Sequence, residues 1–175
     1  ASIPLPIIGI VFIDYVSLYM RNIEPIAIMT IVFALALYFA DKNRAGSKKI
    51  INCSYSLMFF IGLMQALAIM PGVSRAGVVI TAALLVGFTR NDSIRISFLL
   101  SIPTLSAVLL GSSLEAIQSE ETIDWSILIL GGLISFAVSL FCINLFLSFI
   151  QKIGFTPFVL YRIILSITLV GILWI

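Results

Sequence analysis

The sequence predicts an all-α membrane protein that crosses the bilayer about five times and carries one re-entrant helix–loop–helix. Of its 175 residues, 61% are hydrophobic and 10% are charged, and the mean hydropathy is +1.21. This composition is typical of membrane proteins and not of soluble domains. The apolar residues gather in runs long enough to cross a hydrocarbon core of about 30 Å, which takes about 20 helical residues.

Five apolar runs meet this length requirement, and residues that cap or break helices lie at their ends. The runs cover 3–20, 25–40, 93–113, 125–150 and 156–175. Pro25 begins the second run, Asp92 and Asp124 precede the third and fourth, and Pro157 lies at the start of the last. Each run is therefore expected to form one helix.

The segment 51–88 differs because Pro71 and Gly72 divide it into two apolar arms that are each short for a full crossing. Two complete crossings would also return the chain to the same side of the membrane. The arm lengths and the central Pro-Gly favour a re-entrant hairpin. We therefore expect a single integral membrane domain over 1–175, with the hairpin at 51–88.

The charges of the connecting segments predict the orientation. Basic residues occupy three of them: Lys42, Arg44, Lys48, Lys49, Arg90, Arg95 and Lys152. The segment 114–124 holds acids and no Lys or Arg: Glu115, Glu120, Glu121 and Asp124. The positive-inside rule then places the three basic segments in the cytoplasm, and the acidic segment and the C-terminus on the outer side.

The tip of the hairpin, 71–77, is the most informative stretch of the chain. Arg75 places a permanent charge between two apolar runs, which is costly and usually functional. A backbone break at membrane depth is tolerated only where protein or a water-filled cavity surrounds it. The helix N-terminus after the break, the guanidinium of Arg75, the hydroxyl of Ser74, and Gly72 and Gly77, which permit close backbone approach, predict a phosphate or diphosphate site.

Structural interpretations of the same residues stay open. Arg75 would pair with Asp14, the one acid inside an apolar run, and fix helix packing. Gln65, on the first arm, would hydrogen-bond a neighbouring helix. Arg162, near the start of the last run, would snorkel to the cytoplasmic interface.

The composition excludes several other kinds of site. The chain has no histidine, the commonest general base and metal ligand. Cys53 and Cys142 lack metal-ligand spacing and are expected to be unpaired thiols. The net charge of +2, with basic residues that are not interleaved with aromatic ones, argues against nucleic acid as a partner.

Three motifs in order resemble the undecaprenyl-diphosphate phosphatase family, also called the bacitracin-resistance family. They lie at 65–77, 97–103 and 157–162. The resemblance covers essentially the whole chain and corresponds to the C-terminal two-thirds of the family's usual length. It implies a multi-pass enzyme of the bacterial cytoplasmic (inner) membrane, built from inverted repeats whose re-entrant tips meet in a cavity open to the outer face.

The implied activity is hydrolysis of undecaprenyl diphosphate to undecaprenyl phosphate and inorganic phosphate. This hydrolase recycles the carrier lipid of peptidoglycan synthesis and confers resistance to the antibiotic bacitracin. The resemblance gives catalytic roles to Arg75 and Ser74 and substrate-binding roles to Gly72, Gly77, Gln65 and Arg162. The implied partners are a polyprenyl diphosphate lipid and the surrounding membrane lipids, and the implied cofactor is a divalent cation, Mg²⁺ or Ca²⁺.

This chain departs from the family pattern in two ways. Ala76 stands where the family has a second serine, and no stretch matches the family's glutamate pair and its Ser-Ser-Thr-Gly-His run. We therefore expect no metal ligand in this chain, activity of the chain alone to be doubtful, and the chain to be a fragment or a truncated form. A transporter or lipid flippase of inverted-repeat type and a noncatalytic membrane subunit remain alternatives. The oligomeric state, a homo-oligomer included, stays open.

Overall fold

The computed structural model describes residues 2–20, 22–43, 46–118 and 124–173, and these are helical apart from short connections. The α-helices are α1 (Pro4–Tyr19), α2 (Ile23–Lys42), α3 (Tyr55–Gln65), α4 (Arg75–Leu85), α5 (Arg90–Gln118), α6 (Trp125–Ile153) and α7 (Thr156–Leu173). Two 3₁₀ turns, η1 (Ile50–Asn52) and η2 (Ala66–Ile69), flank α3. The described residues form no β-strand, only one isolated bridge between Lys48 and Phe88. The all-α prediction is confirmed for this part of the chain.

Within the described part of the chain, three helices are long and apolar enough to cross a membrane: Ile23–Lys42, Arg90–Leu114 and Trp125–Ile150. They contain the whole of the predicted spans 25–40, 93–113 and 125–150. The other two predicted spans form α1, of 16 residues, and α7, of 18 residues. A membrane protein is thus supported, while five crossings stay a prediction. Arg44, Glu120, Glu121 and the C-terminal residues 174–175 lie outside the described residues.

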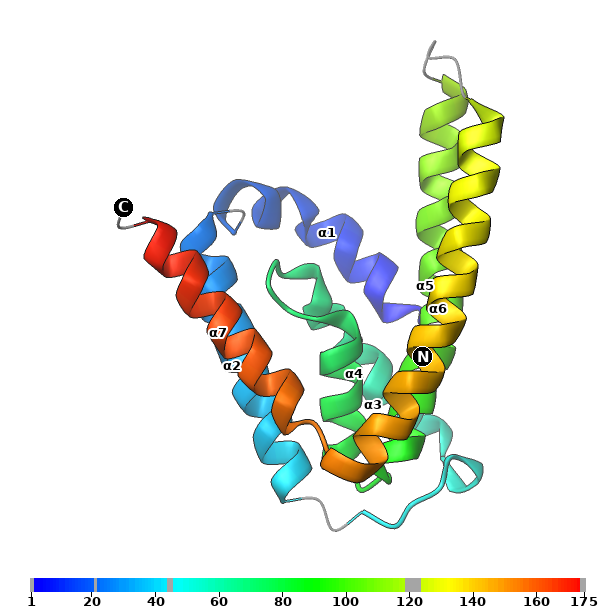
Figure 1. Cartoon of the computed structure of the whole chain (residues 1–175). Coiled ribbons are helices and arrows are strands. Elements are labelled where there is room, and N and C mark those ends of the chain that lie inside the picture. The colour runs from blue at the N-terminus through cyan, green and yellow to red at the C-terminus, as the bar shows by residue number, and fades with distance from the viewer. Residues whose placement is uncertain (1, 21, 44–45, 119–123, 174–175) are drawn as a thin grey trace.

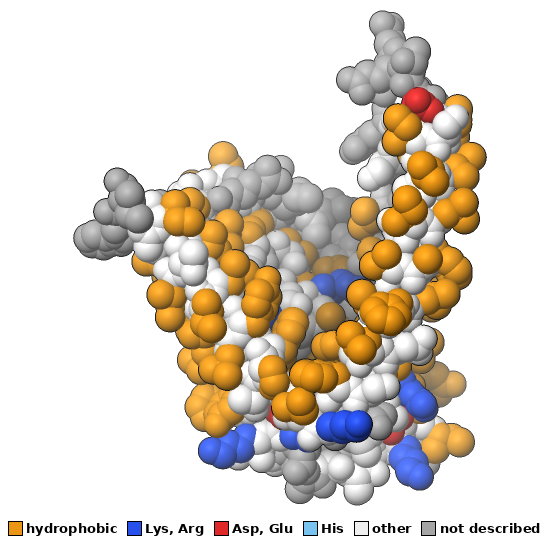
Figure 2. Space-filling view, viewed as in Figure 1, with side chains coloured by type: hydrophobic (Ala, Val, Ile, Leu, Met, Phe, Trp, Pro, Cys, Tyr) orange, Lys and Arg blue, Asp and Glu red, His pale blue; other side chains and the backbone are white. Residues whose placement is uncertain are grey.

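Figure 1 shows the arrangement of the helices. The helices α2 and α7 lie side by side, and the short helices α3 and α4 lie between this pair and α5. The helices α5 and α6 form a long hairpin that extends well beyond the other helices. Most of α6 is exposed, and Figure 2 shows its surface covered with hydrophobic side chains. Such an apolar surface is expected to contact lipid.

The helix α4 is the centre of the packing because it is buried over nearly its whole length. It begins at the side-chain cap of Ser74, and its residues from Gly77 to Leu84 are all buried. One apolar cluster joins Ile80 and Leu84 of α4 to α2, α5, α6 and α7. A second joins Val78 and Val79 to α3 and α5. The element that carries the tip is therefore held on all sides.

A partly buried ion pair fastens the helix ends on the side opposite the tip. Asp41, at the end of α2, is 5% exposed and accepts two hydrogen bonds from Arg90, at the start of α5, from Nε at 2.5 Å and from Nη2 at 2.9 Å. The amide of Phe155 donates to the same carboxylate at 3.3 Å. The orientation prediction counted Arg90 as a free charge of a connecting segment, whereas the structure pairs it with Asp41. This cluster, the Asp41 clasp, joins α2, α5 and the α6–α7 turn.

We predict that Asp41→Ala destabilises the fold by about 2–3 kcal/mol, because it leaves Arg90 and the Phe155 amide without an acceptor in a partly buried position. The measurement is the midpoint of thermal unfolding in detergent, which should fall by several degrees. Lys49→Ala, at an exposed position of the same end, is the control and should stay within about 0.5 kcal/mol. Equal midpoints for the two variants would contradict a stabilising clasp.

Candidate functional site

The tip between η2 and α4 depends on the backbone of Gly72. This residue has φ +84°, a conformation that side chains rarely adopt. A Cβ atom at Gly72 would lie 2.3 Å from the carbonyl oxygen of Ile26 on α2. Glycine is therefore required here both for the turn and for the close approach of the tip to α2.

Two side chains from other helices point at the carbonyl oxygen of Gly72. Nη2 of Arg162, on α7, donates to it at 2.5 Å, and Oγ1 of Thr30, on α2, lies 3.2 Å from it. The Thr30 hydroxyl has a closer acceptor in the carbonyl of Ile26, at 2.7 Å, so Arg162 is the stronger partner. We call this arrangement the Gly72 clamp. The sequence analysis did not single out Thr30.

The clamp changes the interpretation of Arg162. Its side chain is 6% exposed and bonds the tip backbone, so it does not snorkel to the cytoplasmic interface. Its Nη1 lies 3.3 Å from where a Cβ of Gly77 would be. Gly77 is therefore a second position where the absence of a side chain admits a close neighbour, here the guanidinium of Arg162.

The first turn of α4 presents hydrogen-bond donors without acceptors. Oγ of Ser74 accepts from the amide of Gly77 at 3.1 Å and so caps the helix. The amides of Arg75 and Ala76 have no acceptor among the described residues. Such amides at a helix N-terminus, with the positive end of the helix dipole, favour an anion.

The guanidinium of Arg75 adds a charge to these donors. It makes no hydrogen bond or ion pair to any residue that the structure describes, and its Nη1 is buried. The side chain of Asp14 is not described, so a pairing of Arg75 with Asp14 stays untested. A buried, unpartnered guanidinium nitrogen is unusual in folded proteins and indicates a position for an anionic ligand.

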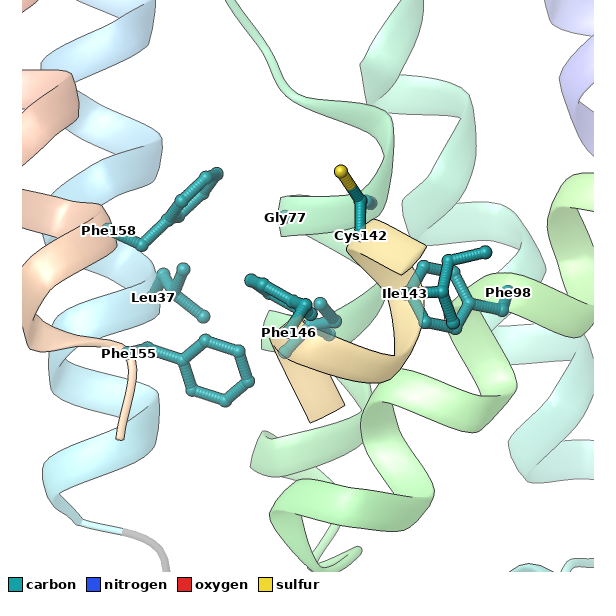
Figure 3. Close-up of a pocket in the computed structure, with 10 residues that line it drawn as sticks. Leu37, Gly77, Phe98, Cys142, Ile143, Phe146, Phe155 and Phe158 are labelled. Carbon is teal, nitrogen blue, oxygen red and sulfur yellow. The ribbon is translucent and has the colours of Figure 1, made fainter. Parts of the chain in front are cut away.

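Two hollows adjoin this turn. One, of about 310 Å³, is lined almost entirely by apolar side chains and reaches Ala76 and Gly77. Figure 3 shows Phe146, Phe155 and Phe158 around it. The other, of about 400 Å³, is lined by the Gly72 clamp and by Ser74. In Figure 2 a Lys or Arg side chain lies in the recess between α7 and the α5–α6 hairpin, far from the basic residues at the lower end.

The structure thus brings four of the predicted site residues together with Arg75 at the start of α4: Gly72, Ser74, Gly77 and Arg162. Gln65 faces another helix. It is fully buried, and its Nε2 donates to Oγ1 of Thr104 on α5 at 3.2 Å. Thr104 in turn donates to the carbonyl of Leu100 at 2.9 Å, beside Pro103, which lies inside α5. The amide nitrogen of Gln65 therefore bonds a neighbouring helix, as the structural interpretation expected.

The described residues offer no group of three or more His, Cys, Asp or Glu side chains that could hold a metal ion. Ala76 lines the apolar hollow. Its carbonyl accepts from Oγ of Ser97 at 3.4 Å. The site as described is a set of donors for an anion beside an apolar hollow, without acidic ligands.

The sequence profile described as Bacitracin resistance protein BacA matches residues 1–168. The chain belongs to this family. Its similar relatives include an undecaprenyl-diphosphatase of Saccharophagus degradans, 42% identical over 99% of this chain. Another is undecaprenyl-diphosphatase 1 of Pseudoalteromonas translucida, 38% identical over 97% of this chain. A third is an undecaprenyl-diphosphatase of Teredinibacter turnerae, 41% identical over 97% of this chain. The chain spans 65%, 64% and 64% of the lengths of these relatives, respectively.

For this BacA-family chain we predict that Gly72→Ala lowers stability by about 1–3 kcal/mol, because the new methyl group meets the Ile26 carbonyl and φ is positive. The measurement is again thermal unfolding in detergent. Gly131→Ala is a matched control, since Gly131 lies in α6 with no atom within 4 Å of the added Cβ, and it should be neutral or slightly stabilising. A Gly72→Ala protein as stable as the Gly131→Ala protein would disprove the close approach.

Proposed function

We propose that this chain is the larger part of an undecaprenyl-diphosphate phosphatase, which hydrolyses undecaprenyl diphosphate to undecaprenyl phosphate and inorganic phosphate. The relatives that carry this name align with 97–99% of the chain, and the aligned part includes the tip. The structural observation that carries the proposal is the unpartnered guanidinium of Arg75 at the N-terminus of α4. Nothing in the comparisons favours the transporter or flippase alternative.

In this proposal Arg75 and Ser74 bind the diphosphate. The planar guanidinium of Arg75 matches two phosphate oxygens, and the free amides of Arg75 and Ala76 supply further donors. Oγ of Ser74 accepts from Gly77, so its own proton stays available for a phosphate oxygen. Phosphoryl transfer is accelerated chiefly by such fixed donors, which stabilise the charge that develops in the transition state.

The other predicted residues act around this centre. Gly72 and Gly77 allow the backbone and Arg162 to approach closely, and Arg162 binds the tip through the Gly72 carbonyl. We keep Gln65 as a weaker substrate-binding residue through its Oε1, which is buried and has no partner among the described residues. The apolar hollow of about 310 Å³ would hold the start of the polyprenyl chain, with the remainder in the membrane.

The proposal includes a re-entrant hairpin. The helices α3 and α4 have 11 residues each, or roughly 16 Å, about half of the hydrocarbon core. The two ends of the hairpin segment are held together, because the amide of Lys48 donates to the carbonyl of Gly87 at 3.0 Å and the amide of Thr89 to the carbonyl of Lys48 at 3.1 Å. The tip would then lie near the middle of a bacterial cytoplasmic membrane and open toward its outer face.

A divalent cation, Mg²⁺ or Ca²⁺, belongs to the proposal as a group that neutralises diphosphate charge when it is bound. The described residues do not fit it, since they form no cluster of acidic, His or Cys ligands. Its ligands would come from the part of the relatives' length that this chain does not span.

We predict that Arg75→Ala lowers phosphate release by about 100-fold or more. The test uses a chimera in which these 175 residues replace the matching part of the Saccharophagus degradans relative. The substrate is undecaprenyl diphosphate, in detergent with Mg²⁺. Arg75→Lys should give an intermediate rate, because it keeps the charge and loses the planar fork of donors.

A second variant, Ser74→Ala, tests the hydroxyl of Ser74 in the same chimera. Its matched control is Ser135→Ala, which removes an exposed hydroxyl from α6. Ser74→Ala should lower the rate and Ser135→Ala should leave it unchanged. Full activity in the Arg75→Ala chimera would refute the assignment of Arg75 to the site.

A further inference from the structure

Basic side chains gather at the end of the molecule that holds the Asp41 clasp. The exposed ones come from α2, α5, α6 and the connection after α2: Lys42, Lys48, Lys49, Arg95 and Lys152. Figure 2 shows basic side chains at this lower end and hydrophobic side chains over the helices above it. We call this surface the basic end.

The acids of the basic end do not compensate these charges. Asp41 is 5% exposed and is bound to Arg90 and Phe155. Asp92 is 8% exposed and accepts from Oγ1 of Thr89 at 2.9 Å. Both acids are therefore mostly buried, and the exposed charged side chains described at this end are all basic. Such a field attracts anions over roughly 10 Å at moderate salt.

A strongly exposed apolar segment follows the two lysines of the connection. Ile51 is 86% exposed and Tyr55 is 97% exposed, the highest values among the large hydrophobic side chains described. Phe39 on α2, 56% exposed, and Ile153 on α6, 51% exposed, lie near the same end. Lysines next to exposed aliphatic and tyrosine side chains are typical of the boundary between lipid headgroups and acyl chains.

We propose that the basic end is a binding surface for anionic phospholipids, whose phosphate groups contact Lys42, Lys49 and Lys152 while Ile51 and Tyr55 contact the acyl chains beneath. The uncompensated cations select the headgroup charge, and the exposed apolar residues select a lipid over a soluble anion. The surface lies at the other end of α4 from Arg75, so the proposal is independent of diphosphate hydrolysis.

The test measures lipid selectivity of the 175-residue chain in phosphatidylcholine bilayers. Spin-labelled phosphatidylglycerol and spin-labelled phosphatidylcholine report the relative association constant of the two lipids at the protein surface. We expect phosphatidylglycerol to be preferred at least about three-fold at low salt, and high salt to bring the ratio near one.

The triple variant Lys42→Gln, Lys49→Gln, Lys152→Gln should lose most of the preference. The matched Lys→Arg triple variant keeps the charges and should retain it. A ratio near one for the unmodified chain at low salt would overturn the proposal, and so would an unchanged preference in a folded Gln variant. If the Gln variant does not fold, the salt titration of the unmodified chain decides: a preference that high salt leaves unchanged overturns the proposal.

Discussion

The structure depends on satisfying a broken backbone inside an apolar body. Between η2 and α4 the chain leaves helical geometry, and the carbonyl of Gly72 needs hydrogen-bond donors from outside the helices on either side. Arg162 and Thr30 provide them from α7 and α2, which must therefore lie side by side at this level. The hydroxyl of Ser166, on α7, adds a buried bond to the carbonyl of Ala27 on α2 at 2.7 Å. The helix pair is thus a support for the tip.

At the tip, the backbone acceptor has hydrogen-bond partners, whereas several hydrogen-bond donors have none. The carbonyl of Gly72 is bonded, while the amides of Arg75 and Ala76 and the guanidinium of Arg75 find no acceptor among the described residues. A surplus of donors and one positive charge beside an apolar hollow favours an anion. Since the low dielectric of such surroundings strengthens these interactions, the same asymmetry suits a ligand with a charged head and an apolar tail.

Features that depend on neighbouring residues could be predicted from the sequence, whereas few of the contacts between distant residues could. Helix class and the tip could be predicted because hydropathy, the Pro-Gly break and the cap at Ser74 are local signals. Thr30 could not, because one hydroxyl 42 residues from Gly72 resembles any other in an apolar helix. The sequence likewise does not show that Arg90, a charge of a connecting segment, pairs with Asp41, or that Arg162 bonds the Gly72 carbonyl. Helices that are apolar all round carry no stripe that fixes their rotation, so the sequence does not show which polar residues meet.

The Asp41 clasp and the Gly72 clamp hold different helices around the apolar hollow. The pair α2 and α7 is fastened at two levels, by the Asp41 clasp at Phe155 and by the Gly72 clamp at Arg162, about 10 Å apart along α7. The α5–α6 hairpin has its ion pair at Arg90, and α5 also bonds α3 and α4 through Thr104 and Ser97. Most of α6 is exposed. The apolar hollow opens between these two bodies. Polar contacts at a distance from Arg75 thus hold the helices that line the hollow, and the Gly72 clamp holds the tip that carries Arg75.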